Sequence, residues 1–430
     1  MRRLLLLVLS GLCAAAVTTA AAAQSSSSAG ATLFDEVWTT INDSSWDGSF
    51  GAVDWAALRT ELRPKAVAAL SADDARAVVN EMLARLKRSH FALLPATPTS
   101  GDEMVLNGNA ELGIDFRIAG ADVVITRRAL APDVMASRIA PGQRIVSIDG
   151  RLMAPRPGEP PLTSWRRVNA AVHGFAGVPA TLVLRDVSGA EVTYRTPRFV
   201  PPGVRVQFSN LSPMRVRVDQ QLVKSPAGRD VGVIEFNIWM ARINQPVANA
   251  FDRFRKNDGI VIDLRGNPGG LAAMISGIAG HFVDTPDLLG TMRTRQVAQL
   301  KFIVNPRTST EDGRTVKPFA GPVAIIVDEM TASASECFAG ALQDLGRVRV
   351  FGRTSMGAAL PASTKRLANG DVLEYVVGDF LTSKGRSLEG GGVVPDEIQP
   401  LSITSLAAGK DDALAAALAW IDRQAGAIRR

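Results

Sequence analysis

The sequence predicts an α/β protein built from more than one domain. Three observations lead to this prediction. Apolar residues recur at helical spacing in the first hundred residues, strand-like runs dominate residues 101–200, and apolar strands alternate with helical stretches from residue 201 onward. Such alternation is typical of a layered core in which helices cover a sheet. A chain of 430 residues is long enough for two or three domains with an ample core.

The first residues predict export. Two arginines precede a short apolar run over residues 4–12, and small residues follow it. This order is typical of a cleaved secretory signal, here residues 1–23, and predicts a periplasmic or secreted protein. A membrane anchor is the alternative, but the apolar run is shorter than the roughly 20 residues that a span requires. Residues 24–31 form a small polar linker.

The composition excludes several functional classes. The chain has two cysteines, too few for a disulfide framework or a cysteine-rich zinc site. Its three histidines, His90, His173 and His281, lie far apart, so we expect no zinc enzyme, no metal and no cofactor. The formal net charge is +6, but basic and acidic residues are interleaved, and we therefore expect no nucleic-acid partner.

Residues 32–100 predict an N-terminal helical region. Ser71 can cap a helix whose acidic first turn suits the positive end of the helix dipole. The apolar residues of this helix share one face: Ala75, Val79, Met82 and Leu86. The helix leads into residues 87–90, and Pro95 and Pro98 then break the chain.

Residues 101–200 predict a β-rich domain, and residues 201–430 predict the α/β core. The strand-like runs of the β-rich domain cover residues 112–118, 123–126, 143–148 and 180–184. Pro201-Pro202-Gly203 marks the boundary. The apolar strands of the core cover residues 231–236, 260–264, 323–327 and 348–352. A helix that begins near Asp411 closes the chain.

The first of three notable stretches in the core is rich in glycine. Residues 263–271 read Asp-Leu-Arg-Gly-Asn-Pro-Gly-Gly-Leu and connect an apolar strand to a helical run. Such a turn can direct backbone N–H groups at an anion. A phosphate loop is an alternative, but the stretch lacks the Gly-Lys-Ser/Thr ending of a P-loop and the spacing of a dinucleotide fingerprint.

The second and third stretches place a serine and a carboxylate in unusual surroundings. Ser333 follows an apolar strand and a turn of small residues and precedes a helix, where the helix dipole would favour a developing oxyanion. A role as a helix cap is the alternative for Ser333 and for Ser335. Glu389 precedes three glycines in the run 387–396. It could orient a base or only cap a turn.

Part of the β-rich segment resembles a PDZ domain. The resemblance rests on Glu111-Leu112-Gly113-Ile114 and on residues 140–150, Ala-Pro-Gly-Gln-Arg-Ile-Val-Ser-Ile-Asp-Gly. It implies that Leu112, Gly113 and Ile114 bind the carboxyl terminus of a peptide, which adds to the sheet as an extra strand. A small β-rich domain without a ligand is the alternative.

The three core stretches together resemble the carboxyl-terminal (tail-specific) processing protease family of serine peptidases. The motifs are Asp-Leu-Arg-Gly-Asn-x-Gly-Gly, Ala-Ser-Ala-Ser-Glu and Glu-x-x-Gly-Val-x-Pro-Asp, and the resemblance covers nearly all of the mature chain. It implies a core related to the crotonase/ClpP-like fold, with Ser333 as the nucleophile. The implied oxyanion donors are the N–H group of Ala334 and one from Gly269 or Gly270.

The chain departs from the best-known branch of this family at one position. That branch uses the lysine of a Gly-Lys-Gly stretch as its general base, and Ala358 stands there in this chain. The tricorn protease core instead uses a histidine oriented by a glutamate, and its Ser-His pair is similar to Ser89-His90. The resemblance thus implies Ser333, His90 and Glu389 as a triad, with Ser89 as an auxiliary group. Histidine suits proton transfer at neutral pH, since its unperturbed pKa is about 6.5.

The sequence therefore predicts an exported serine endopeptidase. Its expected partners are protein or peptide substrates, captured by their carboxyl termini, with no stable membrane span and with oligomerisation left open. The alternative is an inactive PDZ-containing scaffold of the same family, which Ala358 keeps open. Hydrophobic ligand carriage is a third possibility, since the superfamily includes retinoid-binding proteins.

Overall fold

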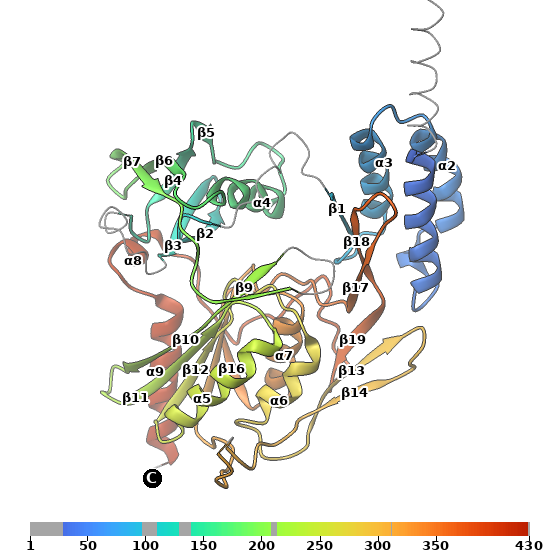
Figure 1. Cartoon of the computed structure of the whole chain (residues 1–430). Coiled ribbons are helices and arrows are strands. Elements are labelled where there is room, and N and C mark those ends of the chain that lie inside the picture. Colours follow the sequence, from blue (N-terminus) through green and yellow to red (C-terminus); the bar gives the residue numbers. More distant parts are fainter. Residues whose placement is uncertain (1–28, 97–109, 129–138, 208–212, 311, 429–430) are drawn as a thin grey trace, which may run out of the picture.

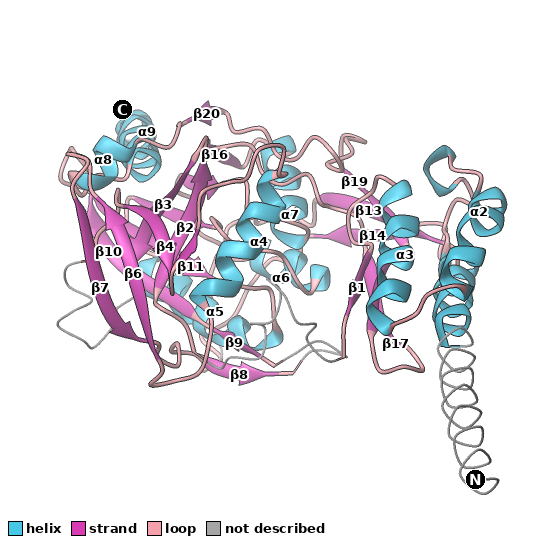
Figure 2. Ribbon diagram, turned by 90° about the horizontal axis from the view of Figure 1, so that it is seen from above, coloured by secondary structure: helices cyan, strands magenta, loops and turns pink. Residues whose placement is uncertain are grey.

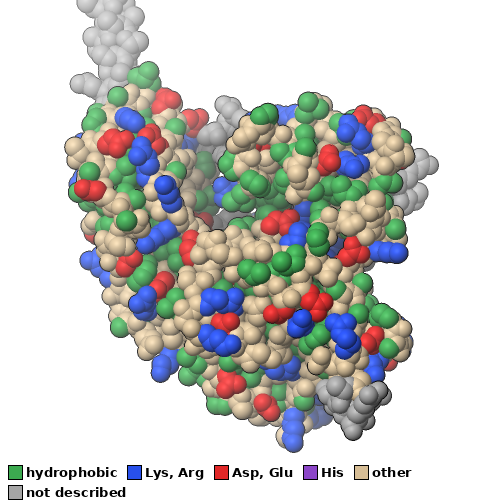
Figure 3. Space-filling view, turned by 180° about the vertical axis from the view of Figure 1, so that it is seen from behind, with side chains coloured by type: hydrophobic (Ala, Val, Ile, Leu, Met, Phe, Trp, Pro, Cys, Tyr) green, Lys and Arg blue, Asp and Glu red, His purple; other side chains and the backbone are tan. Residues whose placement is uncertain are grey.

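The computed structural model describes residues 29–96, 110–128, 139–207, 213–310 and 312–428. The predicted signal, residues 1–23, lies outside these ranges. A helical unit and a small β-rich unit stand side by side above a larger core, as Figures 1 and 3 show from opposite sides. The predicted α/β class is confirmed.

The helical unit packs its helices around an apolar centre of its own. It contains helical residues 29–44, the short η1 (Phe50–Ala52), α2 (Trp55–Val67) and α3 (Ala72–Arg85). Ser71 caps α3 as predicted, because its hydroxyl accepts a 3.1 Å hydrogen bond from Asp74 N–H. The predicted apolar face of this helix is buried: the exposed fractions of Ala75, Val79, Met82 and Leu86 are 0–3 %.

The helical pattern ends earlier than its sequence range suggests. Residues 92–94 form a strand, β1 (Ala92–Leu94), because they pair antiparallel with β18 (Val372–Val376) of the core. With β17 (Ala362–Arg366) they make a three-stranded sheet in the order β1-β18-β17, which lies between α3 and the core (Figure 2). Tertiary pairing thus overrides the local helical pattern.

A buried ion pair fixes this sheet to the helices. The Asp371 carboxylate, which is buried, accepts two 2.9 Å hydrogen bonds from the Arg76 guanidinium and one of 2.8 Å from Ala96 N–H. Burial acts to raise the pKa of the Asp371 carboxyl, but these hydrogen bonds outweigh burial and lower the pKa. The segment that carries His90 is therefore held between α3 and β1.

The β-rich unit is an antiparallel sheet covered by one helix. Its strand order is β2-β3-β4-β6-β7, with the short β5 beside β4. The elements are β2 (Ile114–Ala119), β3 (Asp122–Arg128), β4 (Arg144–Ile148), β5 (Arg151–Leu152), α4 (Pro161–Val172), β6 (Pro179–Arg185) and β7 (Glu191–Pro197). Because β2 is an outer strand of this sheet, one of its edges has no neighbouring strand of the sheet.

The core contains a six-stranded sheet that is mostly parallel. A small ribbon of β8 (Val204–Val206) and β9 (Met214–Val216) leads into it. The order is β10-β11-β12-β15-β16-β20, and only the β10–β11 pair is antiparallel. The strands are β10 (Val218–Lys224), β11 (Asp230–Phe236), β12 (Gly259–Asp263), β15 (Val323–Val327), β16 (Val348–Gly352) and β20 (Glu397–Ile398).

Helices cover both faces of this sheet, as Figure 1 shows. One face carries α5 (Asn244–Phe254), α6 (Ile275–Ala279) and α7 (Ala334–Asp344), preceded by the short η3 (Ala241–Ile243) and η4 (Ala272–Met274). The other face carries α9 (Asp412–Ile428), which follows α8 (Ile403–Ala407). This burial on both faces explains why the central strands read as continuous apolar runs. A second sheet, β14 (Leu300–Ile303), β13 (Leu288–Thr294) and β19 (Gly378–Thr382), extends the core.

The parallel arrangement brings three loops to one edge of the sheet. Residues 264–271 follow β12, residues 328–333 follow β15, and residues 353–361 follow β16. The carboxyl ends of parallel strands are where open α/β sheets bind their ligands. All three stretches that stand out in the sequence have a place at or beside this edge.

Candidate active site

Ser333 occupies a strained position at the start of α7. Its backbone has φ 54° and ψ −120°, in the region that residues with a side chain rarely adopt. Its N–H group donates to the Ala358 carbonyl at 2.8 Å and to Glu336 Oε2 at 3.1 Å. Strain of this kind persists only where surrounding bonds enforce it, and it is concentrated at functional sites.

The glycine-rich loop lies directly against Ser333. A Cβ atom added to Gly269 would lie 2.6 Å from the Ser333 Cβ and 2.9 Å from the Ala334 nitrogen, so only glycine fits. Gly269 and Gly270 have φ of 99° and 131°. The loop is held open by Trp239, whose N–H donates to the Gly269 carbonyl and whose carbonyl accepts from Leu271 N–H, both at 2.8 Å.

The two glycines are not equivalent as oxyanion donors. Gly269 N–H donates to Asn267 Oδ1 at 3.0 Å, so this group is already used inside the loop. The N–H groups of Gly270 and Ala334 make no such bond within the described part of the chain. Of the donors that the sequence offered, Gly270 and Ala334 are therefore the pair that fits best.

A chain of hydrogen bonds joins Glu389, Ser89 and His90. Glu389 Oε1 accepts from Ser89 N–H at 2.8 Å, and Oε2 accepts from the Ser89 hydroxyl at 2.9 Å. The same hydroxyl lies 2.7 Å from His90 Nδ1. Because the one proton of the hydroxyl points to Glu389, the hydroxyl is placed to accept from Nδ1–H, and in a neutral imidazole with this tautomer Nε2 is the acceptor atom.

Residues 357–359 connect this series of hydrogen bonds to Ser333. The Ala358 carbonyl accepts from Ser333 N–H, and Ala359 N–H donates to Glu389 Oε2 at 3.0 Å. Gly390 N–H donates to the Gly357 carbonyl at 2.8 Å. No direct hydrogen bond joins the described His90 and Ser333 side chains. Ala358 therefore belongs to the site through its backbone, although its side chain has no proton acceptor.

The other histidines and the cysteine are unsuited to this chemistry. His281 stacks on Phe251, and burial lowers the pKa of its imidazole to about 3. His173 lies in the β-rich unit, with Nδ1 2.8 Å from the Asn169 carbonyl. Burial raises the pKa of the Cys337 thiol well above its usual range, so no thiolate forms there.

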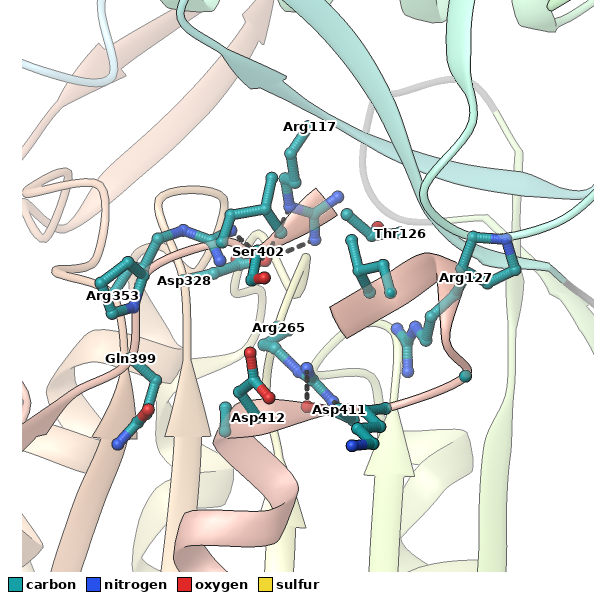
Figure 4. Close-up of a pocket in the computed structure, with 17 residues that line it drawn as sticks. Arg117, Thr126, Arg127, Arg265, Asp328, Arg353, Gln399, Ser402, Asp411 and Asp412 are labelled. Atoms are coloured by element: carbon teal, nitrogen blue, oxygen red, sulfur yellow. Dashed lines mark hydrogen bonds and ion pairs between the residues drawn. The ribbon is translucent and has the colours of Figure 1, made fainter. Parts of the chain in front are cut away.

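Asp328 ties the loops of the site to one another and to the β-rich unit. Its Oδ1 accepts from Gly266 N–H and Met330 N–H, both at 3.0 Å, and its Oδ2 lies 2.6 Å from Arg117 Nη2 of β2. Burial acts to raise the pKa of the Asp328 carboxyl, but the charge of Arg117 leads the opposing effects that hold it low. Figure 4 shows this pair beside Arg265 and Asp411, which are 2.7 Å apart, at a cavity of about 200 Å³.

A second cavity lies along the open edge of β2. It has a volume of about 130 Å³, and its wall includes Ile114 and Phe116 of β2 with Trp165, Asn169 and Val172 of α4. Leu112 is buried, and Gly113 turns the chain into β2 with φ 67°. Of the three residues that the sequence singled out, Ile114 begins β2 and lines this cavity.

Two kinds of feature are not found in the part of the chain that the structure describes. No group of three or more His, Cys, Asp or Glu side chains is placed to hold a metal ion. None of the described helices combines the length and the apolar character needed to cross a bilayer.

Two family models match parts of the chain. Residues 230–398 match the model of peptidase family S41, and residues 31–84 match the tricorn protease C1 domain. The chain carries an S41 domain and is a serine peptidase. As such it acts on protein or peptide substrates.

Relatives of this peptidase are named as carboxyl-terminal processing proteases. The carboxyl-terminal-processing protease of Synechocystis sp. is 27% identical over 380 residues, which are 85% of this chain and 80% of the relative. The carboxy-terminal processing protease CtpB of Bacillus subtilis is 28% identical over 294 residues, 66% of this chain and 53% of the relative.

Solved structures share the fold of this peptidase. The photosystem II D1 C-terminal processing protease has a TM-score of 0.57 at 22% identity and covers 89% of this chain and 98% of its own. The tricorn protease has a TM-score of 0.51 at 18% identity, covering 92% of this chain and 37% of its own.

Sequence reasoning missed several residues of the site. Glu336, Ser355, Asp328 and Arg117 make buried contacts to the loops described above. One signal was available: Ser333-Ala-Ser-Glu336 has the S-x-x-E spacing of a capping box, which points the glutamate back at the serine N–H. The partners of Asp328 and Ser355 come from distant parts of the chain and carry no local signal.

We predict that Gly269→Ala disables the site, because the new Cβ would overlap Ser333 and the backbone has φ 99°. Labelling of the protein by a serine-directed phosphonate should slow by about 100-fold, as expected for a displacement of roughly 1 Å. Gly277→Ala is the matched control, since a Cβ there meets nothing within 4 Å. Equal labelling of the two variants would contradict the close approach.

Proposed function

We propose that this serine peptidase uses Ser333 as nucleophile, His90 as general base and Glu389 as the carboxylate that acts on His90 through Ser89. The observation that carries the proposal is the hydrogen-bond chain from Glu389 through Ser89 to His90 Nδ1, tied to Ser333 by residues 357–359. It leaves Nε2 as the free base. The serine does not need a lysine at position 358 if the histidine activates it.

The proposed reaction follows from these roles. His90 Nε2 takes the Ser333 proton as Oγ attacks the peptide carbonyl, and the N–H groups of Gly270 and Ala334 stabilise the oxyanion. Glu389 stabilises the imidazolium through the Ser89 hydroxyl. His90 then protonates the leaving amine, and water hydrolyses the acyl-enzyme by the same steps in reverse order.

The β-rich unit supports a proposal about the substrate. We infer that it is a PDZ-like module that captures an unstructured carboxyl terminus along β2, with N–H groups near Leu112, Gly113 and Ile114 holding the terminal carboxylate. The open edge of β2 and the cavity beside α4 support this role. Relatives named as carboxyl-terminal-processing proteases point to the same substrate end.

We also propose that the peptidase is exported to the periplasm or secreted. The support is the order of charged, apolar and small residues over 1–23. Protein isolated from an exporting cell should begin near Gln24, which amino-terminal sequencing checks, and an intact Met1 would argue against export.

We predict that Ser333→Ala and His90→Ala each abolish phosphonate labelling. They should lower kcat for peptide hydrolysis by at least ~100-fold, the usual worth of acid–base catalysis. Glu389→Gln and Ser89→Ala should act in the same direction. Ser188→Ala, in an exposed turn of the β-rich unit, serves as the matched serine control. Labelling that survives His90→Ala would exclude histidine as the base, and a wild-type protein that never labels would favour an inactive scaffold.

We predict that peptides with a free carboxyl terminus bind better than the same peptides with an amidated end. Amidation should raise KM by about tenfold or more and leave kcat unchanged, because a charge-assisted hydrogen bond is lost. Steady-state kinetics on matched peptide pairs measures the effect. Equal KM values for the two ends would rule out capture by the terminal carboxylate.

A further inference from the structure

A buried carboxylate outside the proposed triad meets three loops of the site. Glu336 lies in the first turn of α7, and its residue has an exposure of 0%. Its Oε1 accepts from the Ser355 hydroxyl at 2.5 Å and from Gly357 N–H at 2.7 Å. Its Oε2 accepts from Ala358 N–H at 2.9 Å and from Ser333 N–H at 3.1 Å.

This carboxylate is held by hydrogen bonds alone. No Lys, Arg or His side chain forms an ion pair with Glu336 among the described residues. A buried charge without a cation is tolerated when several donors and a helix N-terminus face it. Burial raises the pKa of the Glu336 carboxyl, and the four hydrogen bonds oppose that rise. Because burial of the Glu336 carboxylate is unfavourable, we expect this side chain to have a specific role in the site.

Ser355 extends the network to the loop that carries Glu389. Its hydroxyl donates to Glu336 and accepts from Val393 N–H at 2.6 Å, and its own N–H donates to the Val393 carbonyl at 3.2 Å. Gly392 approaches so closely that a Cβ there would lie 2.6 Å from the Ser355 carbonyl oxygen. Ser355 is buried, with 6% exposure. Only the three glycines 390–392 separate Glu389 from Val393.

We propose that Glu336 and Ser355 form a positioning pair. This pair fixes the position of the nucleophile, Ser333, relative to the triad carboxylate, Glu389. The pair binds Ser333 in its strained conformation, binds Ala358, whose carbonyl also holds Ser333, and binds the loop that follows Glu389. Strain at Ser333 needs such enforcement, and a displacement of about 1 Å between the reacting groups is costly. The inference rests on the proposed roles of Ser333 and Glu389.

The network also explains how Ala358 can replace a functional side chain. Residues 357 and 358 contribute two N–H groups to Glu336 and one carbonyl to Ser333, all from the backbone. These contacts do not require a side chain at position 358. The segment therefore keeps a positioning task although its alanine cannot transfer a proton.

The test compares Glu336→Gln and Ser355→Ala with Glu81→Gln, a partly exposed control on α3 that pairs with Lys65 at the surface. In Glu336→Gln an amide NH₂ replaces an acceptor and faces two N–H donors. We expect kcat to fall by about 100-fold with KM within roughly threefold of wild type, and phosphonate labelling to slow in parallel. Ser355→Ala should show the same pattern with a smaller loss.

Folding is measured on the same samples by thermal unfolding and by circular dichroism. A kcat within threefold of wild type in Glu336→Gln would overturn the proposal. So would a loss in both variants that only matches the fraction of unfolded protein. Ser333→Ala distinguishes the failure of this proposal from the failure of the proposed function. Hydrolysis that persists in that variant refutes Ser333 as the nucleophile rather than the positioning pair.

Discussion

The site depends on the hydrogen bonds that hold Ser333 in a backbone conformation that a serine avoids. Its N–H group is shared between the Ala358 carbonyl and Glu336, and Gly269 fits beneath it because glycine has no side chain. Without these contacts, Ser333 would adopt the backbone conformation usual for a helix N-cap, and its hydroxyl would point in a different direction. The parallel core sheet supplies the frame, since it delivers the loops concerned to one edge.

His90 reaches this edge from a different unit of the protein. It is presented by the turn between α3 and β1, and the Arg76–Asp371 ion pair and the β1–β18 pairing fix that turn to the core. The helical unit thus contributes His90, the proposed base, to the candidate site. The Arg117–Asp328 pair likewise ties the β-rich unit to the core, so a buried ion pair joins each of the two units to the core.

Much of this could be predicted from the sequence, because the features concerned are local. Continuous apolar strands, the Ser71 cap and the glycine pair at 269–270 each show their role within a few residues. Strand β1 could not be predicted, since its partner lies almost 280 residues further on. The choice of Gly270 over Gly269 depends on one hydrogen bond, which Gly269 N–H donates to the Asn267 side chain, and the Glu336–Ser355 contact depends on packing that periodicity does not encode.

The most direct test of the account is the structure of the protein with a peptidyl phosphonate bound covalently. The account predicts a bond from phosphorus to Ser333 Oγ, an oxyanion within hydrogen-bond distance of the Gly270 and Ala334 N–H groups, and His90 Nε2 facing Oγ. The Ser89–Glu389 contacts should be retained. An adduct at another residue, or a His90 ring turned away from Ser333 in the adduct, would contradict it.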